Sequence, residues 1–232
     1  MNKIERKALL TDRFESAYGA QPVLWSRAPG RVDLMGSHTD YNMGYVMTMT
    51  TDMDTWIAAR PRTDRHVRVR SLNVAGESLF SLDNIDHDAS VPWSDYVRGM
   101  AYVLHEAGYP LQGFDGLIHS TVPFGSGLSS SAAIEMAIGN MFATVGGFEI
   151  DPVQMALLGQ RAENQFVGVN SGILDQYSST MGRAGCSLLL DCRHLQSQSV
   201  QICEDWQVVI CDTRAERSLA GSEYDDRRAQ CE

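Results

Sequence analysis

The sequence predicts a globular chain that mixes helices with strands and is large enough for one domain or one and a half. Its 232 residues are 44% apolar, so the chain can bury a substantial core. Short runs rich in β-branched and aromatic residues indicate strands, and other segments repeat apolar residues at helical spacing. No internal repeat or low-complexity tract interrupts this pattern. A soluble protein of mixed secondary structure is therefore expected.

The N-terminal part of the chain is predicted to hold a helix followed by strands. Residues 2–18 place apolar side chains on one face of an amphipathic helix. Pro29 and Gly30 predict a turn, and a polar loop over 37–42 precedes the first pair of strands. Strands are expected at 45–49, 55–59, 67–71 and 78–82.

Two helices with identifiable starts are expected in the middle of the chain. Ser94 is placed to cap a helix that ends near Gly108, because apolar residues follow it at helical spacing. Asp151 and Pro152 open a second helix that reaches roughly to Phe166. Further strands are expected at 187–191 and 208–211, and the charged pattern over 223–232 favours a helix.

The segment 122–135, VPFGSGLSSSAAIE, has the pattern of a phosphate-binding loop that runs into a helix. Gly125 and Gly127 permit a tight turn and a close approach of a ligand to the backbone, in part at positive φ. The unpaired N–H groups at the start of the alanine-rich helix would face this loop and attract an anion. Ordinary helix capping by serine explains the same local pattern. No lysine follows the glycines, so a P-loop NTPase is excluded at this position.

Three other polar or aromatic features mark candidate sites. The loop over 37–42 is crowded with hydrogen-bonding groups and is either a sugar site or a solvated hairpin loop. Asp175 lies in an otherwise uncharged run, 167–182, so we expect it to be partly buried and to need a partner. A purely structural role for this aspartate is the alternative. Trp93 is either a packing residue or a stacking surface for adenine.

Composition and charge narrow the classes of partner. Lys and Arg total 19 against 29 Asp and Glu, and the resulting net charge of −10 disfavours nucleic acid and anionic membranes. No apolar run approaches a membrane span, and the charged N-terminus lacks the apolar stretch of a signal peptide. Small molecules and a cytoplasmic location are therefore expected. The five cysteines show no metal-binding spacing and are interpreted as free thiols.

Three ordered segments resemble the GHMP kinases, and specifically their galactokinase branch. APGRVDLMGSHTDYN at 28–42 resembles the sugar signature of that branch, and VPFGSGLSSSAA at 122–133 resembles its ATP motif. AENQFVGVNSGILDQY at 162–177 resembles the segment that carries the catalytic aspartate. WSDYVRG and SLAGSEYDDRRAQCE are similar to the same branch, so the resemblance covers nearly the whole chain.

The resemblance implies an α+β fold, the GHMP kinase fold, with a ribosomal-protein-S5-like N-terminal domain and an active site between two domains. The N-terminal domain is expected at 1–180, and the start of a C-terminal domain at 181–232. A third family motif, a glycine-rich segment in the C-terminal half, is absent, which predicts either a fragment or a reduced paralogue. The chain by itself is expected to be inactive and to self-associate through surface meant for the missing half.

The resemblance also implies a reaction. The γ-phosphoryl group of ATP would pass to the anomeric hydroxyl of galactose or a galacto-configured sugar, with Mg²⁺ as the metal. Asp175 would be the base that orients the sugar hydroxyl, and Arg31 would hold Asp175 and bring positive charge to the transferred group. A catalytically silent sensor of sugar and ATP is the alternative function.

Further residues are assigned to ligands by the resemblance alone. Trp93 would border adenine, and the phosphates would be cradled by Gly125, Ser126, Gly127, Leu128, Ser129, Ser130 and Ser131. Mg²⁺ would be held by Ser131 and Glu163, with the two preceding serines as alternatives to Ser131. The monosaccharide would contact Arg31, Ser37, His38, Asp40, Gly172, Asp175 and Tyr224.

The sugar signature departs from the family pattern at two positions. Ser37 stands where the family has a glutamate that binds the hydroxyl on carbon 6, and Asp33 stands where it has an asparagine. Loss of that glutamate leaves the substrate open. The candidates are galactose, arabinose, which lacks carbon 6, and galacturonate, which a glutamate would repel.

Overall fold

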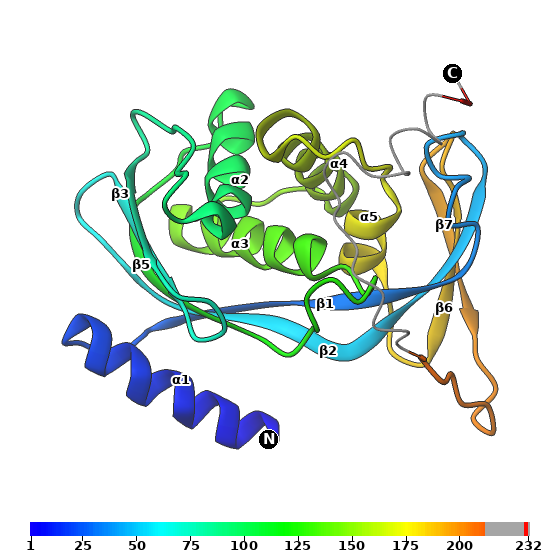
Figure 1. Ribbon diagram of the computed structural model, residues 1–232, viewed down its shortest axis with the longest axis horizontal. Helices are drawn as coiled ribbons and strands as arrows, with labels where there is room; N and C mark the ends of the chain where they lie inside the picture. Colours follow the sequence, from blue (N-terminus) through cyan, green and yellow to red (C-terminus); the bar gives the residue numbers. More distant parts are fainter. Residues whose placement is uncertain (212–229, 232) are drawn as a thin grey trace.

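One mixed sheet runs through the molecule and carries helices on both faces (Figure 1). The computed structural model describes residues 1–211 and 230–231. Its strands are β1 (Leu24–Met35), β2 (Tyr45–Pro61), β3 (His66–Ser71), β4 (Glu77–Ser81), β5 (Phe114–Ser120), β6 (Cys186–Asp191) and β7 (Gln196–Gln201). They form a seven-stranded sheet in the order β4-β3-β5-β2-β6-β7, with β1 paired to β2. The pairing of β3 with β5 is parallel, and the others are antiparallel.

The longest strand, β2, is the centre of the sheet. It runs unbroken for 17 residues. One edge of β2 pairs with β1, while the other edge pairs first with β6 and then with β5. The expectation of two separate strands at 45–49 and 55–59 was therefore wrong. The polar residues between them do not end the strand, because β1 pairs with Thr50 and again with Asp54, on either side of a register shift.

The helices lie in two unequal layers. They are α1 (Lys3–Tyr18), α2 (Asp95–Glu106), α3 (Ser130–Gly146), α4 (Pro152–Ala162) and α5 (Leu174–Met181), with short turns η1 (Pro92–Ser94) and η2 (Glu163–Val167). Figure 1 shows α2 to α5 on one face of the sheet and α1 on the other. Side chains of successive β2 residues point to opposite faces of the sheet. Ala58 packs against Phe14 of α1, whereas Ile57 belongs to the larger core with α2 and α3. The mixed α+β architecture is thereby confirmed.

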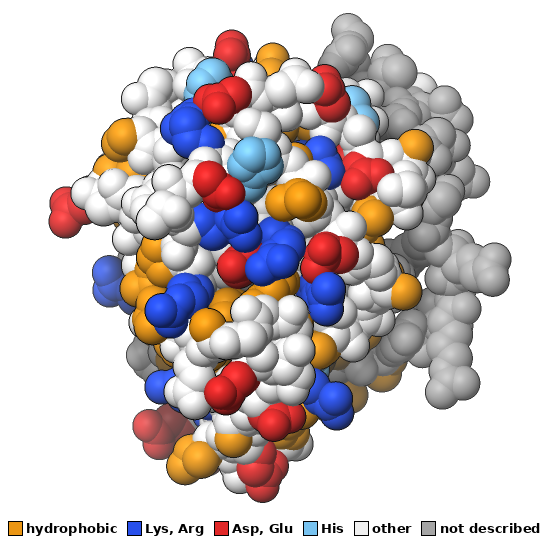
Figure 2. Space-filling view, turned by 90° about the vertical axis from the view of Figure 1, so that its left-hand side faces the viewer, with side chains coloured by type: hydrophobic (Ala, Val, Ile, Leu, Met, Phe, Trp, Pro, Cys, Tyr) orange, Lys and Arg blue, Asp and Glu red, His pale blue; other side chains and the backbone are white. Residues whose placement is uncertain are grey.

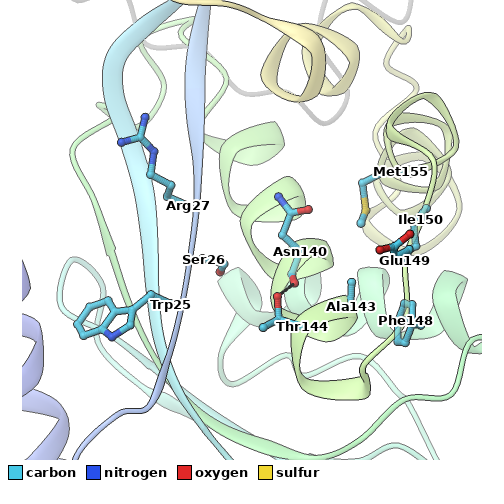
Figure 3. A pocket seen from close by; sticks show the side chains of 10 residues that line it. All are labelled: Trp25, Ser26, Arg27, Asn140, Ala143, Thr144, Phe148, Glu149, Ile150 and Met155. Carbon is cyan, nitrogen blue, oxygen red and sulfur yellow. Dashed lines mark hydrogen bonds between the residues drawn. The ribbon is translucent and has the colours of Figure 1, made fainter.

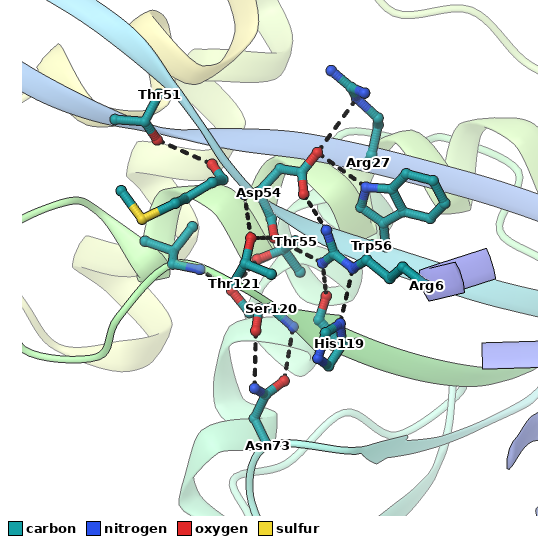
Figure 4. A network of polar contacts seen from close by, with 12 residues as sticks. Arg6, Arg27, Thr51, Asp54, Thr55, Trp56, Asn73, His119, Ser120 and Thr121 are labelled. Carbon is teal, nitrogen blue, oxygen red and sulfur yellow. Dashed lines mark hydrogen bonds and ion pairs between the residues drawn. The ribbon is translucent and has the colours of Figure 1, made fainter. Parts of the chain in front are cut away.

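A buried arginine fastens α1 to the sheet (Figure 4). Arg6 forms an ion pair with Asp54 of β2, and its Nη2 donates to the Asp54 carbonyl at 2.9 Å. Its Nε donates to Nδ1 of His119 in β5 at 2.8 Å. Burial lowers the pKa of His119 and the neighbouring Arg6 lowers it further, so the imidazole serves as a neutral acceptor. The helix is thus tied to two adjacent strands.

Charged side chains protect the edge of the sheet at β3 and β4. Figure 2 views the molecule from this side and shows basic and acidic side chains interleaved. Arg70 of β3 pairs with Glu77 of β4, and Arg68 pairs with Asp115 of β5 at 2.8 Å. Such exposed pairs contribute little stability. Glu77 places a charge on the short edge strand β4, and charge at an edge discourages pairing with another chain.

The three helices predicted at 2–18, after Ser94 and after Asp151 begin where expected, but only the cap at Asp151 forms as predicted. The predicted N-terminal helix is α1, which begins with a capping box formed by Asn2 and Glu5. Asp151 caps α4 by accepting from two backbone N–H groups. Ser94 precedes α2 but gives no side-chain cap. Its hydroxyl instead accepts a hydrogen bond from Arg98 at 3.2 Å, so a tertiary contact replaces the cap.

Several elements differ from the sequence prediction. Pro29 and Gly30 form no turn but sit at a register shift inside β1, where the bulge absorbs the proline. The strands β1, β5 and β7 and the helix α5 were not predicted. Residues 208–211 form no strand, because no described strand pairs with them.

The last described strands continue the same sheet. The predicted strand near 187–191 is β6, which pairs with the start of β2, and β7 pairs with β6. The domain boundary expected at residue 180 stays a prediction. The helix expected over 223–232 lies almost wholly outside the described residues. Within the described part, no helix has both the length and the apolar character needed to cross a membrane.

Candidate active site

Arg31 of β1 joins three segments that are distant in sequence. Its Nε donates to Oδ1 of Asp175 at 2.8 Å, and its Nη2 contacts the same oxygen. Its Nη1 donates to the carbonyl of Gly127 at 2.7 Å. Ser129 donates its hydroxyl to the other Asp175 oxygen, Oδ2. The structure therefore brings the two expected catalytic residues together and fastens both to the glycine loop.

The glycine loop is held against β1 by its backbone. Gly125 and Gly127 have φ of 68° and 78°, which are conformations that favour glycine. The backbone N–H of Arg31 donates to the carbonyl of Leu128 at 3.1 Å. A Cβ on Gly30 would lie 2.6 Å from that carbonyl, so only glycine permits this approach. The expected tight turn at positive φ is confirmed.

The start of α3 leaves its first N–H groups without a side-chain cap. Ser129 occupies the N-cap position in the left-handed region, with φ of 57°, and its hydroxyl is directed to Asp175. This conformation is strained for a non-glycine residue, and the hydroxyl contact with Asp175 holds it in place. The uncapped N–H groups at the head of a 17-residue helix are a suitable anion site.

A pocket of about 190 Å³ adjoins this helix start. Trp93, Ser130 and Ser131, all expected near ATP, line it together. Trp93 is fixed by donating its Nε1–H to the carbonyl of Ala75 at 3.1 Å. Asn73 and Tyr96 line the same pocket, and sequence reasoning assigned neither of them to a site. Tyr96 lies in the segment WSDYVRG, which resembles the family, whereas no motif marks Asn73, which the β3–β4 connection brings there only in the folded chain.

Two buried glutamates lie behind the serines. Glu163, at the start of η2, is 2% exposed and accepts from Ser171 and from Gln176, the latter at 2.9 Å. Gln176 also donates to Glu135 of α3 at 2.9 Å. Burial raises the pKa of both glutamates, and the mutual proximity of their charges raises that of Glu135 further. Glu135 and Gln176 were missed by the sequence reasoning, because both resemble ordinary helix residues.

The residues expected to hold a divalent cation fit that role. Ser131 hydrogen-bonds to Glu163, which brings a hydroxyl and a carboxylate to one point beside the glycine loop. Both supply hard oxygen ligands of the kind that Mg²⁺ takes in phosphoryl-transfer sites. Ser129, one of the alternatives to Ser131, directs its hydroxyl to Asp175 instead. Among the described residues, no group of three or more His, Cys, Asp and Glu side chains forms a metal cluster.

Asp40 is buried against the segment that precedes Asp175. A Cβ on Gly172 would fall 1.8 Å from Asp40 Oδ2, so this position must be glycine for Asp40 to lie there. Oδ2 accepts from the N–H of Leu174 at 3.4 Å, while Oδ1 is buried with no hydrogen-bond partner. Burial raises the pKa of Asp40, and the charge of Asp175 raises it further. An orphaned acceptor so close to Asp175 is a suitable contact for a ligand hydroxyl.

The remaining predicted site residues have clear placements. Ser37 and His38 are exposed on the β1–β2 loop, where His38 Nδ1 lies 2.7 Å from the hydroxyl oxygen of Tyr41. Ser126 turns its hydroxyl to the Pro123 carbonyl at 2.9 Å. The Leu128 side chain packs in a small apolar cluster of the loop. Tyr224 lies outside the described residues.

A larger cleft of about 460 Å³ lies away from this constellation, between β1 and the C-terminal half of α3 (Figure 3). Trp25 and Arg27 line one side, and Asn140 and Thr144 line the other. None of the buried unpaired polar atoms of the described residues lies in it. Size alone therefore does not identify the site, and the chemistry is concentrated around Asp175.

Two family models match the chain. Residues 12–61 match the galactokinase galactose-binding signature, and residues 95–183 match the GHMP kinases N terminal domain. The first match contains the β1–β2 loop with Asp40. The second contains the glycine loop, Glu163 and Asp175. The two matches therefore cover the described parts of the candidate site apart from Asn73 and Trp93.

Named galactokinases are similar over almost the whole chain. The galactokinase of Chloroflexus aggregans is 48% identical over 219 residues, which are 94% of this chain and 56% of the relative. That of Roseiflexus sp. is 47% identical over 96% of this chain and 57% of the relative. The chain thus spans little more than half the length of these relatives.

Solved structures agree on the fold. A crystal structure of Lactococcus lactis galactokinase complexed with galactose has a TM-score of 0.86 at 35% identity, over 96% of this chain and 59% of that chain. Methanococcus jannaschii mevalonate kinase has a TM-score of 0.63 at 20% identity, over 77% of this chain and 56% of that chain. The second likeness concerns the fold alone.

Proposed function

Because the chain belongs to the galactokinase branch of the GHMP kinases and has their fold, we propose that it forms the N-terminal part of a sugar 1-kinase. The reaction would transfer the γ-phosphoryl group of ATP to the anomeric hydroxyl of galactose or a galacto-configured sugar. The protein would act in the cytoplasm on small molecules. The observation that carries the proposal is the contact of Asp175 with both Arg31 and the glycine loop.

Asp175 is the proposed base for the sugar hydroxyl. Its two oxygens are each held by a donor, Arg31 on one side and Ser129 on the other, so its carboxylate cannot rotate freely. Oδ2 keeps a further lone pair for an incoming hydroxyl, whereas Arg31 already contacts Oδ1 with two of its nitrogens. Phosphoryl transfer needs an oriented nucleophile and electrostatic stabilisation more than covalent help, and the Arg31 guanidinium supplies positive charge at that place.

The nucleotide would lie between the glycine loop and Trp93. Its phosphates would accept from the loop and helix N–H groups of residues 125–131, and its base would occupy the pocket lined by Trp93. Mg²⁺ would be held by Ser131 and Glu163, and it would neutralise charge on the phosphates when bound. The burial of Glu163 excludes water from one side of this position.

The sugar would occupy the space between the β1–β2 loop and Asp175. The unpaired Oδ1 of Asp40 supports this placement, because a sugar hydroxyl would satisfy it. The backbone at Gly172 lies against Asp40 and would form one wall. Arg31, Ser37 and His38 remain proposed sugar contacts on the strength of the family resemblance, as does Tyr224. The division into domains at residue 180 is part of the same proposal.

The test is a coupled assay of sugar-dependent ADP release, made on a form of the protein with a complete second domain. Asp175→Asn keeps the shape but cannot take the proton, and it should lower kcat by about 10²–10⁴-fold. Binding of a non-hydrolysable ATP analogue, measured by calorimetry, should change little. Turnover by the variant within about threefold of wild type would remove Asp175 from catalysis. Binding of both ligands without any turnover would indicate a sensor instead of a kinase.

A further inference from the structure

We infer that Asp33 determines which sugar this site accepts, by taking a hydrogen bond from a hydroxyl remote from the reacting one. The inference rests on the proposed function, because it concerns the sugar of that same site. It assigns the substrate as a neutral galacto-configured hexose, in preference to a pentose without the hydroxymethyl group or to a uronic acid. Four features of Asp33 and its surroundings carry it.

The side chain of Asp33 faces the same side of the sheet as the catalytic group. The pairing of β1 with β2 is in regular register from Arg31 to Asp33. Side chains two residues apart on a strand share a face, and Arg31 uses that face to reach Asp175. Thr48, directly across the ladder from Asp33, also uses it, because its hydroxyl contacts Ser178 of α5 at 2.7 Å.

The distance along β1 suits a monosaccharide. A strand rises about 3.3 Å per residue, so Asp33 lies roughly 6.6 Å along the strand from Arg31. That separation is comparable to the width of a six-membered sugar ring with its substituents. A sugar that lies along this face of β1, with one end near Arg31, would therefore bring its other end towards Asp33.

The carboxylate of Asp33 is oriented before any ligand binds. Its Oδ1 accepts from the N–H of Met35 at 3.1 Å, and its Oδ2 accepts from the hydroxyl of Ser37 at 2.5 Å. Within the described residues, no Lys, Arg or His forms an ion pair with it. An oriented and unneutralised carboxylate with spare lone pairs is a strong acceptor for a hydroxyl.

Two polar residues of the β1–β2 loop, Ser37 and Asp40, present acceptors. Ser37 directs its own proton to Asp33, so its oxygen has only lone pairs left for a ligand. Asp40, which is 6% exposed, contributes the unpaired Oδ1. A ligand must therefore supply hydroxyl donors, and a carboxylate brought to Asp33 would meet like charge. This is the physical reason for excluding a uronic acid.

The test compares three sugars on wild type and Asp33→Asn, in a form of the protein with a complete second domain. Galactose, arabinose and galacturonate are each assayed for kcat/KM by ADP release and for Kd by thermal shift. Wild type should prefer galactose. In Asp33→Asn, kcat/KM for galactose should fall about tenfold to a hundredfold through KM, since a hydrogen bond to a charged group is lost. The kcat/KM for arabinose should stay within about threefold of wild type, and the ratio of kcat/KM for galacturonate to that for galactose should rise.

Two further variants serve as controls for the interpretation of Asp33→Asn. Asp52→Asn makes the same charge change at an exposed position of β2, and it should leave all three sugars within about threefold of wild type. Ser37→Ala removes the donor that orients Asp33, and it should shift the galactose to arabinose ratio in the same direction but by less. If Asp33→Asn fails to fold, the galactose to arabinose ratio of Ser37→Ala tests the role of Asp33.

The possible failures are distinguishable. Wild-type turnover of galactose with an unchanged sugar ratio in Asp33→Asn and Ser37→Ala would overturn the role of Asp33 and leave the kinase proposal standing. A wild-type preference for galacturonate would overturn the assigned substrate class. If wild type neither binds nor turns over any of the three sugars, the proposed function itself fails, and this inference fails with it.

Discussion

Replacing the buried Glu135 by glutamine should stabilise the protein at neutral and alkaline pH. Glu135 is fully buried, and its Oε1 has no hydrogen-bond partner. Gln176 donates to the other oxygen of Glu135, while its own Oε1 is also unpaired. Glu135 and Gln176 are therefore hydrogen-bonded to each other, yet each has an Oε1 that lacks a donor. A proton on Glu135, or an amide in its place, supplies one.

The expected pH dependence follows from the direction of the pKa shift. Burial, with the charge of Glu163 second, raises the pKa of Glu135 above its unfolded value. Above the unfolded pKa the unfolded chain releases this proton while the folded chain retains it, so stability falls as the pH rises towards the folded pKa. The glutamine in Glu135→Gln does not titrate, so the stability of the variant lacks this pH dependence. The free energy of unfolding that the variant gains over wild type should therefore be smallest near pH 5 and largest near pH 8.

The magnitude comes from the unpaired oxygens. A buried polar group without a partner costs about 1–3 kcal/mol, so the variant should gain about that much at pH 8. For a chain of this length the melting temperature should rise by about 2–4 °C for each kcal/mol. Urea unfolding at pH 5 and pH 8 measures both ends of the range. Glu106→Gln, an exposed glutamate at the end of α2, is the matched control and should stay within about 0.5 kcal/mol.

Two results would refute this reasoning. Lower stability of Glu135→Gln than of wild type at pH 8 would mean that an ionised Glu135 is the favoured partner of Gln176. A gain of equal size at both pH values would mean that the folded and unfolded chains bind the same number of protons over this range, so that the pKa of Glu135 is not raised by folding. In either case, the buried pair would have to be assigned another arrangement of protons.

Two further predictions concern the contact of Arg6 with His119, which ties α1 to the sheet, and the isolated chain. The lowered pKa of His119 implies stability that is present above its unfolded pKa, about 6.5, and lost as the pH falls towards the folded value, because the unfolded chain binds the proton first. In His119→Asn the side-chain oxygen replaces Nδ1 as acceptor for Arg6. Urea titrations should therefore show that this variant loses less stability than wild type between pH 7.5 and pH 5.5. Equal losses of stability in the two proteins would contradict the prediction. The 232-residue chain alone should give no sugar-dependent ADP release and should self-associate in light scattering, since loss of positioning removes a term worth up to ~7–11 kcal/mol. Robust turnover by this chain would show that its site is complete.

Features governed by neighbouring residues were predictable from the sequence. The positive φ of Gly125 and Gly127, the cap of α4 at Asp151 and the amphipathic α1 each depend on a few adjacent side chains. The contact of Arg31 with Asp175 was also expected, but for another reason. Two separated motifs matched one family, and the match supplied the long-range contact that local patterns do not contain.

Features governed by tertiary contacts were not predictable in this way. β5 is short and its aspartate and histidine obscure an apolar strand, although pairing with β2 and β3 makes it one. Glu135 lies in an alanine-rich helix, where a glutamate normally indicates an exposed face, yet contact with Gln176 of α5 buries it. The turn expected at Pro29 failed because β2 was able to pair around a bulge. Each outcome depends on pairing or packing with a segment at least 25 residues away in the sequence.

The attachment of the glycine loop to Arg31 limits how such a site can change during evolution. Gly127, Leu128 and Ser129 each bond to Arg31 or Asp175, so a substitution that reshapes the loop also displaces the proposed base. The far wall of the pocket, with Asn73, makes no bond to either residue. Altered preference among nucleotides should therefore arise by substitutions in that wall, while the loop stays constant. Directed evolution towards another phosphate donor would be most productive there.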